Sequence, residues 1–243
     1  MIISPKEIHF FHENGYLHIP NFLSSERCDT IMEGIEKRAE GHYHNYLHLH
    51  EEVPEVQALI TDSKLLAVCD SVNDHRMVPV GSIFFFCKPN NPLEAGSLPH
   101  QEVYAVKAEY GAYLVAAVAF DDADEENGSF IVYPGSHTMG KFPFTTKKNF
   151  DYREDGQLQQ ANPIGPITDY PKSLEKTKIQ LTYKRGDLLL VHDHVLHYAD
   201  RNTSKDRWRR KIYMHFIKDG HPFWPGWNAR RQVMDRPPRF TSE

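Results

Sequence analysis

Side chains that could bind a metal ion occur as a close pair, His100 and Glu102, and a distant single residue, His197. Two imidazoles and one carboxylate can form the facial triad of non-haem iron(II), which leaves coordination positions open for a co-substrate and dioxygen. On a strand, His100 and Glu102 would point to the same side and therefore toward one metal ion. These residue types at this spacing indicate an iron-dependent oxygenase.

Two neighbouring arginines after the distal histidine, Arg209 and Arg210, could bind the carboxylate of an organic acid. A guanidinium group offers two parallel N–H donors that match the two oxygens of a carboxylate. Adjacent residues on a strand point to opposite faces, so only one of the two can face the site. Strand alternation alone leaves open which arginine it is.

Four stretches of the chain, each weak alone, occur in a characteristic order. They cover residues 11–24, 99–102, 120–137 and 186–209. Together they resemble the phytanoyl-CoA dioxygenase (PhyH) superfamily of Fe(II)/2-oxoglutarate-dependent oxygenases. The resemblance implies a dioxygenase that uses Fe(II), 2-oxoglutarate and O2. Its expected reaction is hydroxylation, desaturation, cyclisation or epoxidation of a small metabolite or natural-product intermediate.

The resemblance also implies which residues bind the metal. They are His100, Glu102 and His197, and the family pattern places the distal ligand at His197 rather than at His192 or His194. A metal-bound histidine normally donates its second ring N–H to a fixed acceptor. The sequence does not identify that acceptor.

For the co-substrate, the resemblance favours Arg209 over Arg210, because the residues that follow align with the family. One residue more than the usual family spacing precedes this arginine. Lys88 could also help bind 2-oxoglutarate, although a solvated lysine at a strand edge is an equal alternative. Gln101 and Tyr104 flank the metal pair and are expected to face the substrate.

Two departures from the family pattern keep other functions open. The family usually has His-x-Asp where this chain has Glu102, and it often has a hydroxyl residue at the position of Ala199. A glutamate is still a hard oxygen ligand that suits iron(II). One alternative is a non-catalytic binding or regulatory member of the same fold. Another is a metal-dependent isomerase or lyase that does not use oxoglutarate.

The composition of the 243 residues indicates one domain, 1–243, with a sizeable core, since 40% are hydrophobic. The net charge of −5 argues against a nucleic-acid partner. No apolar run is long enough to cross a membrane, and the first residues do not resemble a secretory signal. Three cysteines without metal-finger spacing indicate buried thiols in a reducing compartment, so we expect a cytoplasmic protein. The expected partner is a small-molecule substrate, as the resemblance implies.

The pattern of the chain predicts an α+β fold. Helices are expected over about 1–75, beginning with a capping box at Ser4 to Glu7, and a double-stranded β-helix (a cupin-like jelly roll) over about 77–218, with the helices packed on its sheet. The predicted strands cover residues 83–87, 113–120, 129–133, 179–183, 188–192 and 211–217. The aromatic C-terminal tail, 219–243, is expected to pack on the barrel or on a second copy in a homodimer.

Three other segments have competing interpretations. The histidine-rich tract 42–50 is predicted to form a rim of polar and aromatic residues, with a second metal site or a substrate entrance as alternatives. The acidic run 121–126 is predicted to be a solvated loop. The polar stretch 138–178 has few strand signals, and long loops of this kind are functional lids or disordered segments.

Overall fold

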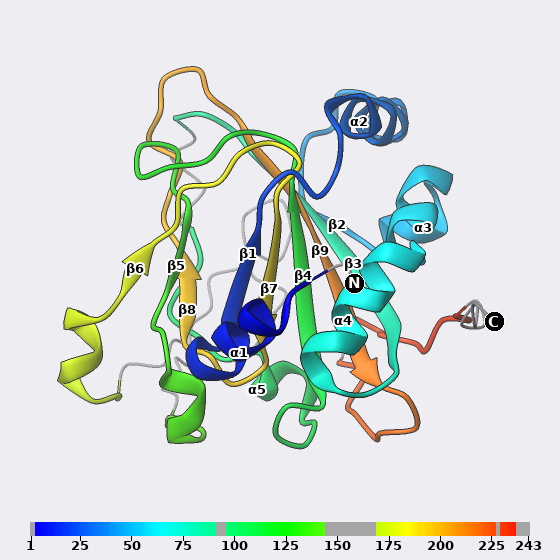
Figure 1. Ribbon diagram of the computed structural model, residues 1–243. Coiled ribbons are helices and arrows are strands. Elements are labelled where there is room, and N and C mark those ends of the chain that lie inside the picture. Colours follow the sequence, from blue (N-terminus) through cyan, green and yellow to red (C-terminus); the bar gives the residue numbers. More distant parts are fainter. Residues whose placement is uncertain (1–2, 91–95, 144–168, 227–228, 237–243) are drawn as a thin grey trace.

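The computed structural model describes residues 3–90, 96–143, 169–226 and 229–236, and it runs from helices to strands (Figure 1). The helices are α1 (Pro5–Asn14), α2 (Ser25–Ala39), α3 (Pro54–Ile60), α4 (Ser63–Asn73) and α5 (Val103–Val106), with short 3-10 helices η1 (Leu49–Glu51), η2 (Ser136–Met139) and η3 (Lys172–Lys176). None of the described helices is long and apolar enough to span a membrane.

Helix α1 begins and ends at the residues that its sequence marks. The Ser4 hydroxyl accepts a hydrogen bond from the Glu7 N–H at 3.3 Å, and the Glu7 carboxylate accepts one from the Ser4 N–H at 2.6 Å. Pro5 suits the first helical turn because it has no N–H to leave unpaired. Gly15 ends the helix with a φ of 77°, a conformation that glycine adopts without strain. The predicted capping box is therefore confirmed.

The strands form two antiparallel sheets. They are β1 (Tyr16–Ile19), β2 (Tyr46–Leu47), β3 (Met77–Cys87), β4 (Tyr113–Ala119), β5 (Phe130–Val132), β6 (Ile179–Gln180), β7 (Leu188–His192), β8 (His197–Ala199) and β9 (Arg209–Lys218). The larger sheet has the order β1-β7-β4-β9-β3-β2, and the smaller has the order β6-β5-β8. Each predicted strand overlaps an observed one, although the predicted strand 179–183 shortens to Ile179–Gln180.

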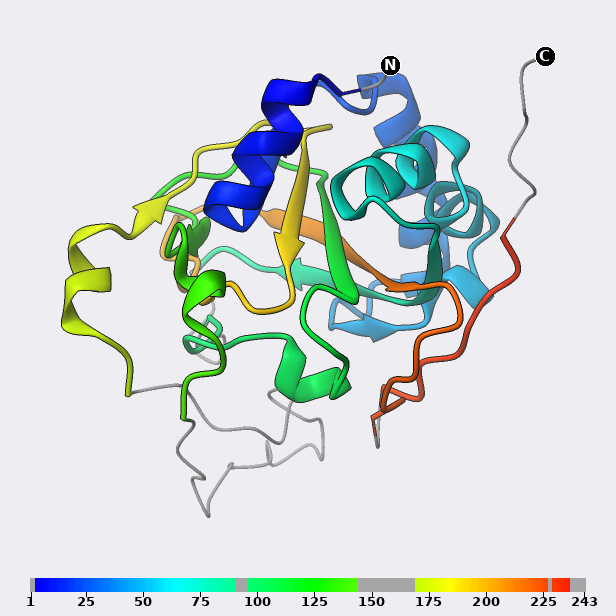
Figure 2. The same ribbon diagram turned by 60° about the horizontal axis from the view of Figure 1, so that its bottom comes forward.

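The two sheets face each other as in a jelly roll, and the N-terminal helices cover the outside of the larger one. Both ribbon views place α2, α3 and α4 on one side of the larger sheet and β5, β6 and β8 on the other (Figures 1 and 2). One apolar core lies between helices and sheet, and a second lies between the two sheets. The expected fold class is confirmed.

Strand β9 divides its side chains between these two cores. Ile212, Met214 and Phe216 are fully buried in the core beneath the helices. The alternate residues Tyr213 and Ile217 pack in the core between the sheets. Because strand side chains alternate, every odd-numbered residue from 209 to 217 faces the space between the sheets. This parity decides which basic residues can reach the site.

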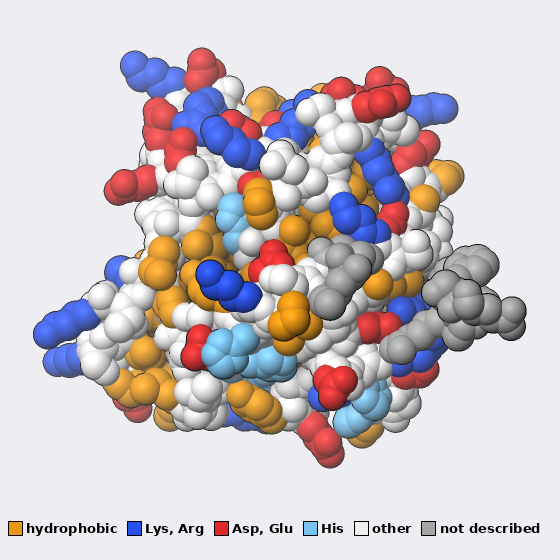
Figure 3. All heavy atoms as spheres, viewed as in Figure 1, with side chains coloured by type: hydrophobic (Ala, Val, Ile, Leu, Met, Phe, Trp, Pro, Cys, Tyr) orange, Lys and Arg blue, Asp and Glu red, His pale blue; other side chains and the backbone are white. Residues whose placement is uncertain are grey.

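The C-terminal tail packs on the barrel. The N–H groups of Gln232 and Met234 donate hydrogen bonds to the carbonyl oxygens of Val80 and Pro79 on β3, at 3.0 and 2.9 Å. Arg236 then makes a two-pronged ion pair with the Asp70 carboxylate on α4. On the face drawn in Figure 3, acidic and basic side chains of the described residues are interspersed rather than separated by sign.

Candidate active site

The two histidines of the predicted metal site are neighbours in the smaller sheet. The His100 N–H donates to the His197 carbonyl oxygen at 2.9 Å, and the His197 N–H donates to the His100 carbonyl oxygen at 3.1 Å. The Ser97 N–H likewise donates to the carbonyl oxygen of Ala199 at 2.8 Å. Residues 97–100 therefore extend the smaller sheet beside β8, and the backbone holds the two imidazoles with their centroids 4.3 Å apart.

Glu102 joins the histidines from a turn, not from a strand. Its Oε1 lies 3.2 Å from His100 Nε2 and 3.6 Å from His197 Nε2. The expectation that His100 and Glu102 share one strand was wrong: strand pairing ends at His100, and Glu102 is the helical N-cap of α5 with φ of −63°. The carboxylate reaches the same point because the chain turns rather than because the side chains alternate.

Gln101 explains this turn. Its amide nitrogen donates to the carbonyl oxygens of His194 and Gly140 at 2.6 and 2.9 Å, and its amide oxygen accepts from the Phe142 N–H at 2.9 Å. The side chain is fully buried. Its two N–H groups and its oxygen are thus occupied by backbone, so the structure gives Gln101 a structural contact where the sequence suggested a substrate contact.

The unassigned acceptors of the two histidines are backbone carbonyl groups. His100 Nδ1 lies 2.6 Å from the carbonyl oxygen of Leu98, and His197 Nδ1 lies 3.0 Å from that of Val195. Nδ1–H must donate in both contacts, because a carbonyl oxygen only accepts. In neutral histidines this leaves the Nε2 lone pair free, and both Nε2 atoms face Glu102. Phe130 stacks on His197 with centroids 4.9 Å apart and fixes the ring plane.

The pKa of each member of the trio is shifted by at least one other member. Burial alone would raise the pKa of Glu102, but the imidazoles of His100 and His197 hold it well below its usual range. Burial and the charge of His100 lower the pKa of His197. Burial would also lower the pKa of His100, but the hydrogen bond and the charge of Glu102 raise it above its usual value. A carboxylate anion beside a neutral His197 is the protonation state that a divalent cation requires.

The trio fits a metal ion. Ligand atoms in adjacent positions of an octahedral centre, with bonds of about 2.1 Å, lie about 3 Å apart. The separations of 3.2 and 3.6 Å from Glu102 Oε1 to the two histidine nitrogens are close to that value. The ligand atoms of His100, Glu102 and His197 all lie within 4.8 Å of one another. This arrangement can hold one divalent cation by one face.

The two adjacent arginines lie on opposite faces of β9. Arg209 is 2% exposed and belongs to the face between the sheets. Arg210 lies on the helix side, where it makes a two-pronged pair with Asp121 and an ion pair with Glu36 at 2.7 Å. Arg209 therefore shares the interior with the metal trio, and Arg210 does not.

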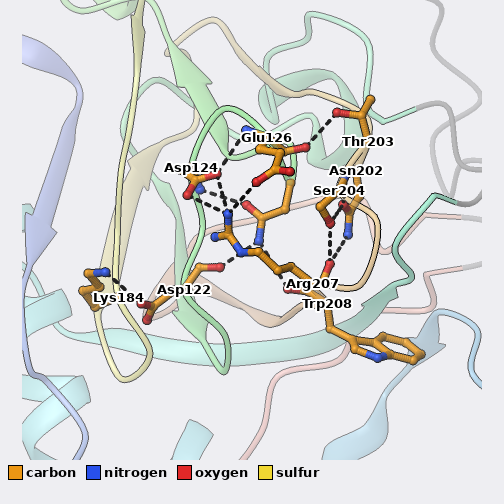
Figure 4. Close-up of polar contacts among 10 residues, drawn as sticks. Asp122, Asp124, Glu126, Lys184, Asn202, Thr203, Ser204, Arg207 and Trp208 are labelled. Carbon is orange, nitrogen blue, oxygen red and sulfur yellow. Dashed lines mark hydrogen bonds and ion pairs between the residues drawn. The ribbon is translucent and has the colours of Figure 1, made fainter.

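The loop before Arg209 accommodates the extra residue through a polar network (Figure 4). Arg207 makes ion pairs with Asp124 and Glu126 at 2.9 and 3.2 Å. The Asn202 amide donates to the carbonyl oxygens of Cys87 and Arg207 at 3.1 and 2.8 Å. The loop is thereby anchored to the end of β3 and to the acidic run. That run is not simply solvated, because several of its carboxylates hold this loop.

Two glycines allow the chain beyond β8 to pass closely. A Cβ on Gly96 would lie 2.5 Å from the Ala199 carbonyl oxygen, and one on Gly128 would lie 2.3 Å from the Asp200 carbonyl oxygen. Both glycines have positive φ, of 70° and 76°. The segment that leads from the distal histidine to Arg209 is therefore in close backbone contact with both Gly96 and Gly128.

The sequence analysis missed Lys211, a second buried cation on the interior face. Lys211 is 5% exposed, its Nζ lies 4.9 Å from the ring centroid of Tyr213, and its charge acts on His100. Lys211 and Tyr213 line a small hollow of about 20 Å³ between the sheets. Phe130, which stacks on His197, lines the same hollow, and Ala117 on β4 keeps it open by its small size. Lys211 is two residues after Arg209 on the same strand and therefore faces the same side, and this spacing is the signal that could have identified it.

The remaining predicted contacts lie near the ends of these elements. Lys88 follows β3, and its Nζ lies 5.3 Å from the ring centroid of Tyr43. Tyr104 is on α5, and its hydroxyl donates a hydrogen bond to the Phe142 carbonyl oxygen. Roles of Lys88 with 2-oxoglutarate and of Tyr104 with substrate stay predictions. Most of the polar stretch 138–178, namely 144–168, lies outside the described residues.

Two further histidine groups bring possible ligand atoms together in the described part of the chain: His48, His50 and Glu51, and His192, Asp193 and His194. In the first, His50 Nδ1 is 2.7 Å from the Ser82 hydroxyl, and His48 Nε2 contacts the Ala229 carbonyl oxygen.

In the second group, Nδ1 atoms of His192 and His194 lie 2.9 and 2.7 Å from one oxygen of Asp193. The other Asp193 oxygen accepts from the Tyr113 N–H at 3.4 Å. One ring nitrogen of each of these four histidines is therefore in contact with a polar group of the protein.

The chain is similar to known proteins in sequence and in fold. A family model described as phytanoyl-CoA dioxygenase (PhyH) matches residues 11–211. Phytanoyl-CoA dioxygenase domain-containing protein 1 from Bos taurus is 23% identical over 301 residues, covering 98% of this chain and 99% of that protein. The protein of the same name from Mus musculus is 27% identical over 202 residues, and the matched region covers 80% of this chain and 64% of the mouse protein.

Solved structures share the fold. The non-haem alpha-ketoglutarate-dependent carbocyclase SnoK from nogalamycin biosynthesis superposes with a TM-score of 0.74 at 20% identity, covering 98% of this chain and 94% of that one. EctD from S. alaskensis, solved with 2-oxoglutarate and 5-hydroxyectoine, gives a TM-score of 0.71 at 14% identity, covering 98% and 86%. The family model spans most of the chain, and the chain therefore belongs to the phytanoyl-CoA dioxygenase family.

Proposed function

We propose that this protein is an Fe(II)/2-oxoglutarate-dependent dioxygenase that oxidises a small metabolite or natural-product intermediate. The observation that carries the proposal is the convergence of His100 Nε2, His197 Nε2 and the Glu102 carboxylate on one point. Both Nδ1 atoms are bound to backbone carbonyl groups, so the ring nitrogens that remain for a metal are the two that face Glu102.

The chain's own residues would perform two tasks. His100, Glu102 and His197 would hold iron(II) by one face and leave the opposite positions for a bidentate 2-oxo acid and dioxygen. Iron with these co-substrates supplies oxidative decarboxylation to succinate and carbon dioxide, coupled to oxidation of the substrate. Arg209 would bind the distal carboxylate of 2-oxoglutarate, because its guanidinium is buried on the interior face.

The residues around the small hollow support this placement of the co-substrate. The trio does not line it, but Lys211 and Phe130, which stacks on His197, both do, and its wall is mostly apolar apart from Lys211, Asp187 and His18. A five-carbon dicarboxylate needs one cationic end and one metal-bound end, with an apolar wall between them. Lys211 and Arg209 together would supply the cationic end, and the side chains of Phe130 and Tyr213 would exclude water from the reacting end.

Anaerobic addition of Fe(II) and 2-oxoglutarate to the purified protein tests the proposal. A metal-to-ligand charge-transfer band in the visible range is expected only when both are present. Succinate release under air, stimulated by a substrate, would separate a turning-over enzyme from a non-catalytic member of the fold. No band together with no oxoglutarate binding by calorimetry would reject the proposal and favour a metal-dependent isomerase or lyase.

A further inference from the structure

Arg231 is a buried guanidinium that the proposed metal and co-substrate chemistry does not use. It lies on the C-terminal tail and is 7% exposed. Among the described residues its Nε has no hydrogen-bond partner, its NH1 reaches the carbonyl oxygens of Ala105 and Pro225 at 3.5 and 3.4 Å, and its guanidinium also hydrogen-bonds to the Tyr113 phenol. Among the described residues no carboxylate pairs with it, whereas Arg236 on the same tail pairs with Asp70. A buried, uncompensated cation is costly unless an anion completes it.

His215 presents a second unsatisfied donor at the same place. Its Nδ1 lies 2.6 Å from the Tyr113 hydroxyl, and its Nε2 is buried without a partner among the described residues. Burial and then the charge of Arg231 lower the pKa of His215 to about 3, against the opposing effect of Glu102. The imidazole is therefore neutral. With the phenol donating to Nδ1, the ring proton lies on Nε2, where no described residue accepts it.

The backbone register brings Arg231 and His215 together. His215 pairs with Gly81 across β3 and β9. The stem of Arg231 lies over Gly81, with Cγ 3.8 Å from the position that a Cβ would take. The Arg231 guanidinium carbon is 6.0 Å from the centroid of Tyr113, whose ring stacks on that of His215. The guanidinium, phenol and imidazole thus form one group.

This group lies within the electrostatic reach of Glu102 but apart from the co-substrate arginine. Burial raises the pKa of Tyr113, the charge of Arg231 opposes the rise and that of Glu102 adds to it, so Tyr113 is within the field of both. Along β9, His215 is six residues from Arg209, which corresponds to about 20 Å. Tyr213 lies between them on the same face. The group is therefore well separated from Arg209 along the same face of β9.

We propose that Arg231 and His215 bind a carboxylate group of the oxidised substrate, with Tyr113 as a positioning residue that fixes the His215 tautomer. This inference rests on the proposed function. It commits to a carboxylate rather than a phosphate, because the group offers one positive charge, a planar fork and one neutral N–H. A single carboxylate matches that donor set, whereas a phosphate dianion would need a second cation.

The test uses the full chain loaded with Zn(II) and 2-oxoglutarate, so that the co-substrate already occupies the positions at which acetate could chelate the metal. Acetate is titrated while the 15N-labelled His215 Nε2 resonance, assigned with the His215→Gln variant, is followed. We expect a saturable shift with acetate and none with acetamide. Arg231→Gln should raise the acetate dissociation constant about ten- to hundred-fold. Arg231→Lys should raise it less, because charge and stem remain.

Arg230→Gln is the matched control, since Arg230 is exposed on the same tail, and it should leave acetate binding unchanged. Calorimetry of 2-oxoglutarate on each variant reports whether the metal site is intact. Acetate binding that is equal in the parent and Arg231→Gln, equal binding of acetamide, tighter binding of inorganic phosphate, or no binding to the parent would each overturn the subsite.

The subsite and the proposed function can fail separately. Loss of 2-oxoglutarate binding in the parent would reject the function, and the acetate titration can then be repeated on metal-free protein. If the parent binds 2-oxoglutarate and turns it over, a screen of carboxylic acids against their amides addresses the subsite alone. Acids should stimulate succinate release more than amides in the parent, and Arg231→Gln should raise the KM of an acid with a smaller effect on kcat.

Discussion

His100 and His197 are hydrogen-bonded to each other through both backbone groups, so the sheet itself sets the distance between the two imidazoles. The pairing does not use the side chains. A variant that removes one imidazole should therefore keep its fold while losing a ligand. This separation of fold from ligation makes the metal assignment testable.

Removal of either imidazole should abolish stoichiometric iron binding. In His100→Ala or His197→Ala, two ligands remain, and two rarely hold a labile divalent ion. The measurement is iron content after anaerobic loading, with circular dichroism as the check of fold. His194→Ala is the control, because His194 belongs to the Asp193 group and should not affect iron. Full iron content in His197→Ala, or its loss in His194→Ala, would move the site to that second group.

Arg209 and Arg210 should separate cleanly in their effects. Arg209→Ala should raise the dissociation constant of 2-oxoglutarate about ten- to hundred-fold, since a buried charge-assisted pair is worth roughly 1.5–3 kcal/mol. Iron should still bind. Arg210→Ala should leave this constant nearly unchanged but lower the free energy of unfolding by about 1–3 kcal/mol, because Asp121 loses its two-pronged partner. The opposite pattern in calorimetry and denaturation would exchange the two roles.

Most of the fold could be predicted from local signals. The capping box at Ser4 and the strand runs each arise from neighbouring residues, and each appears in the structure. The spacing of His100, Glu102 and His197 also identified the group that the structure brings together. Alternation along β9 then decides between Arg209 and Arg210 as soon as one residue of that strand is placed in the apolar core.

The errors came from contacts between distant parts of the chain. The turn at Glu102 depends on the Gln101 amide reaching the carbonyl oxygens of His194 and Gly140, which no local pattern reveals. Arg231 approaches β9 because the tail pairs with β3, and that pairing is likewise not visible in the sequence. The position of Lys211 could have been predicted, because it lies two residues after Arg209 on the same strand and faces the same side.

Gln101 should behave as a structural residue. Gln101→Ala would leave the Phe142 N–H and two carbonyl groups without partners, at a cost of roughly 1–3 kcal/mol or more in the free energy of unfolding. Chemical denaturation measures this loss. A substrate contact would instead leave stability unchanged and raise KM alone. Leu98→Ala, at an exposed position near the same turn, is the matched control and should cost little.

Lys211 should assist the binding of 2-oxoglutarate. Lys211→Met keeps most of the apolar stem but removes the charge that lines the hollow. We expect the dissociation constant of 2-oxoglutarate to rise by up to about tenfold, less than for Arg209→Ala, because an ammonium group lacks the planar fork. Calorimetry with Fe(II)-loaded protein measures the change. An unchanged constant would confine the cationic end of the co-substrate site to Arg209.

Glu102 is the ligand by which the chain departs from the usual family pattern, and its reach is set by the turn that Gln101 fixes. Glu102→Asp keeps the ligand type but withdraws the carboxylate by one methylene from His100 and His197, which now lie 3.2 and 3.6 Å from it. We expect this variant to bind iron more weakly and to keep part of the turnover. Glu102→Ala removes the anion, so most activity should be lost, and the pKa of His100, which Glu102 raises, should fall. Iron content and succinate release measure both effects. Substrate oxidation by Glu102→Ala at the parent rate would show that the carboxylate is not a ligand.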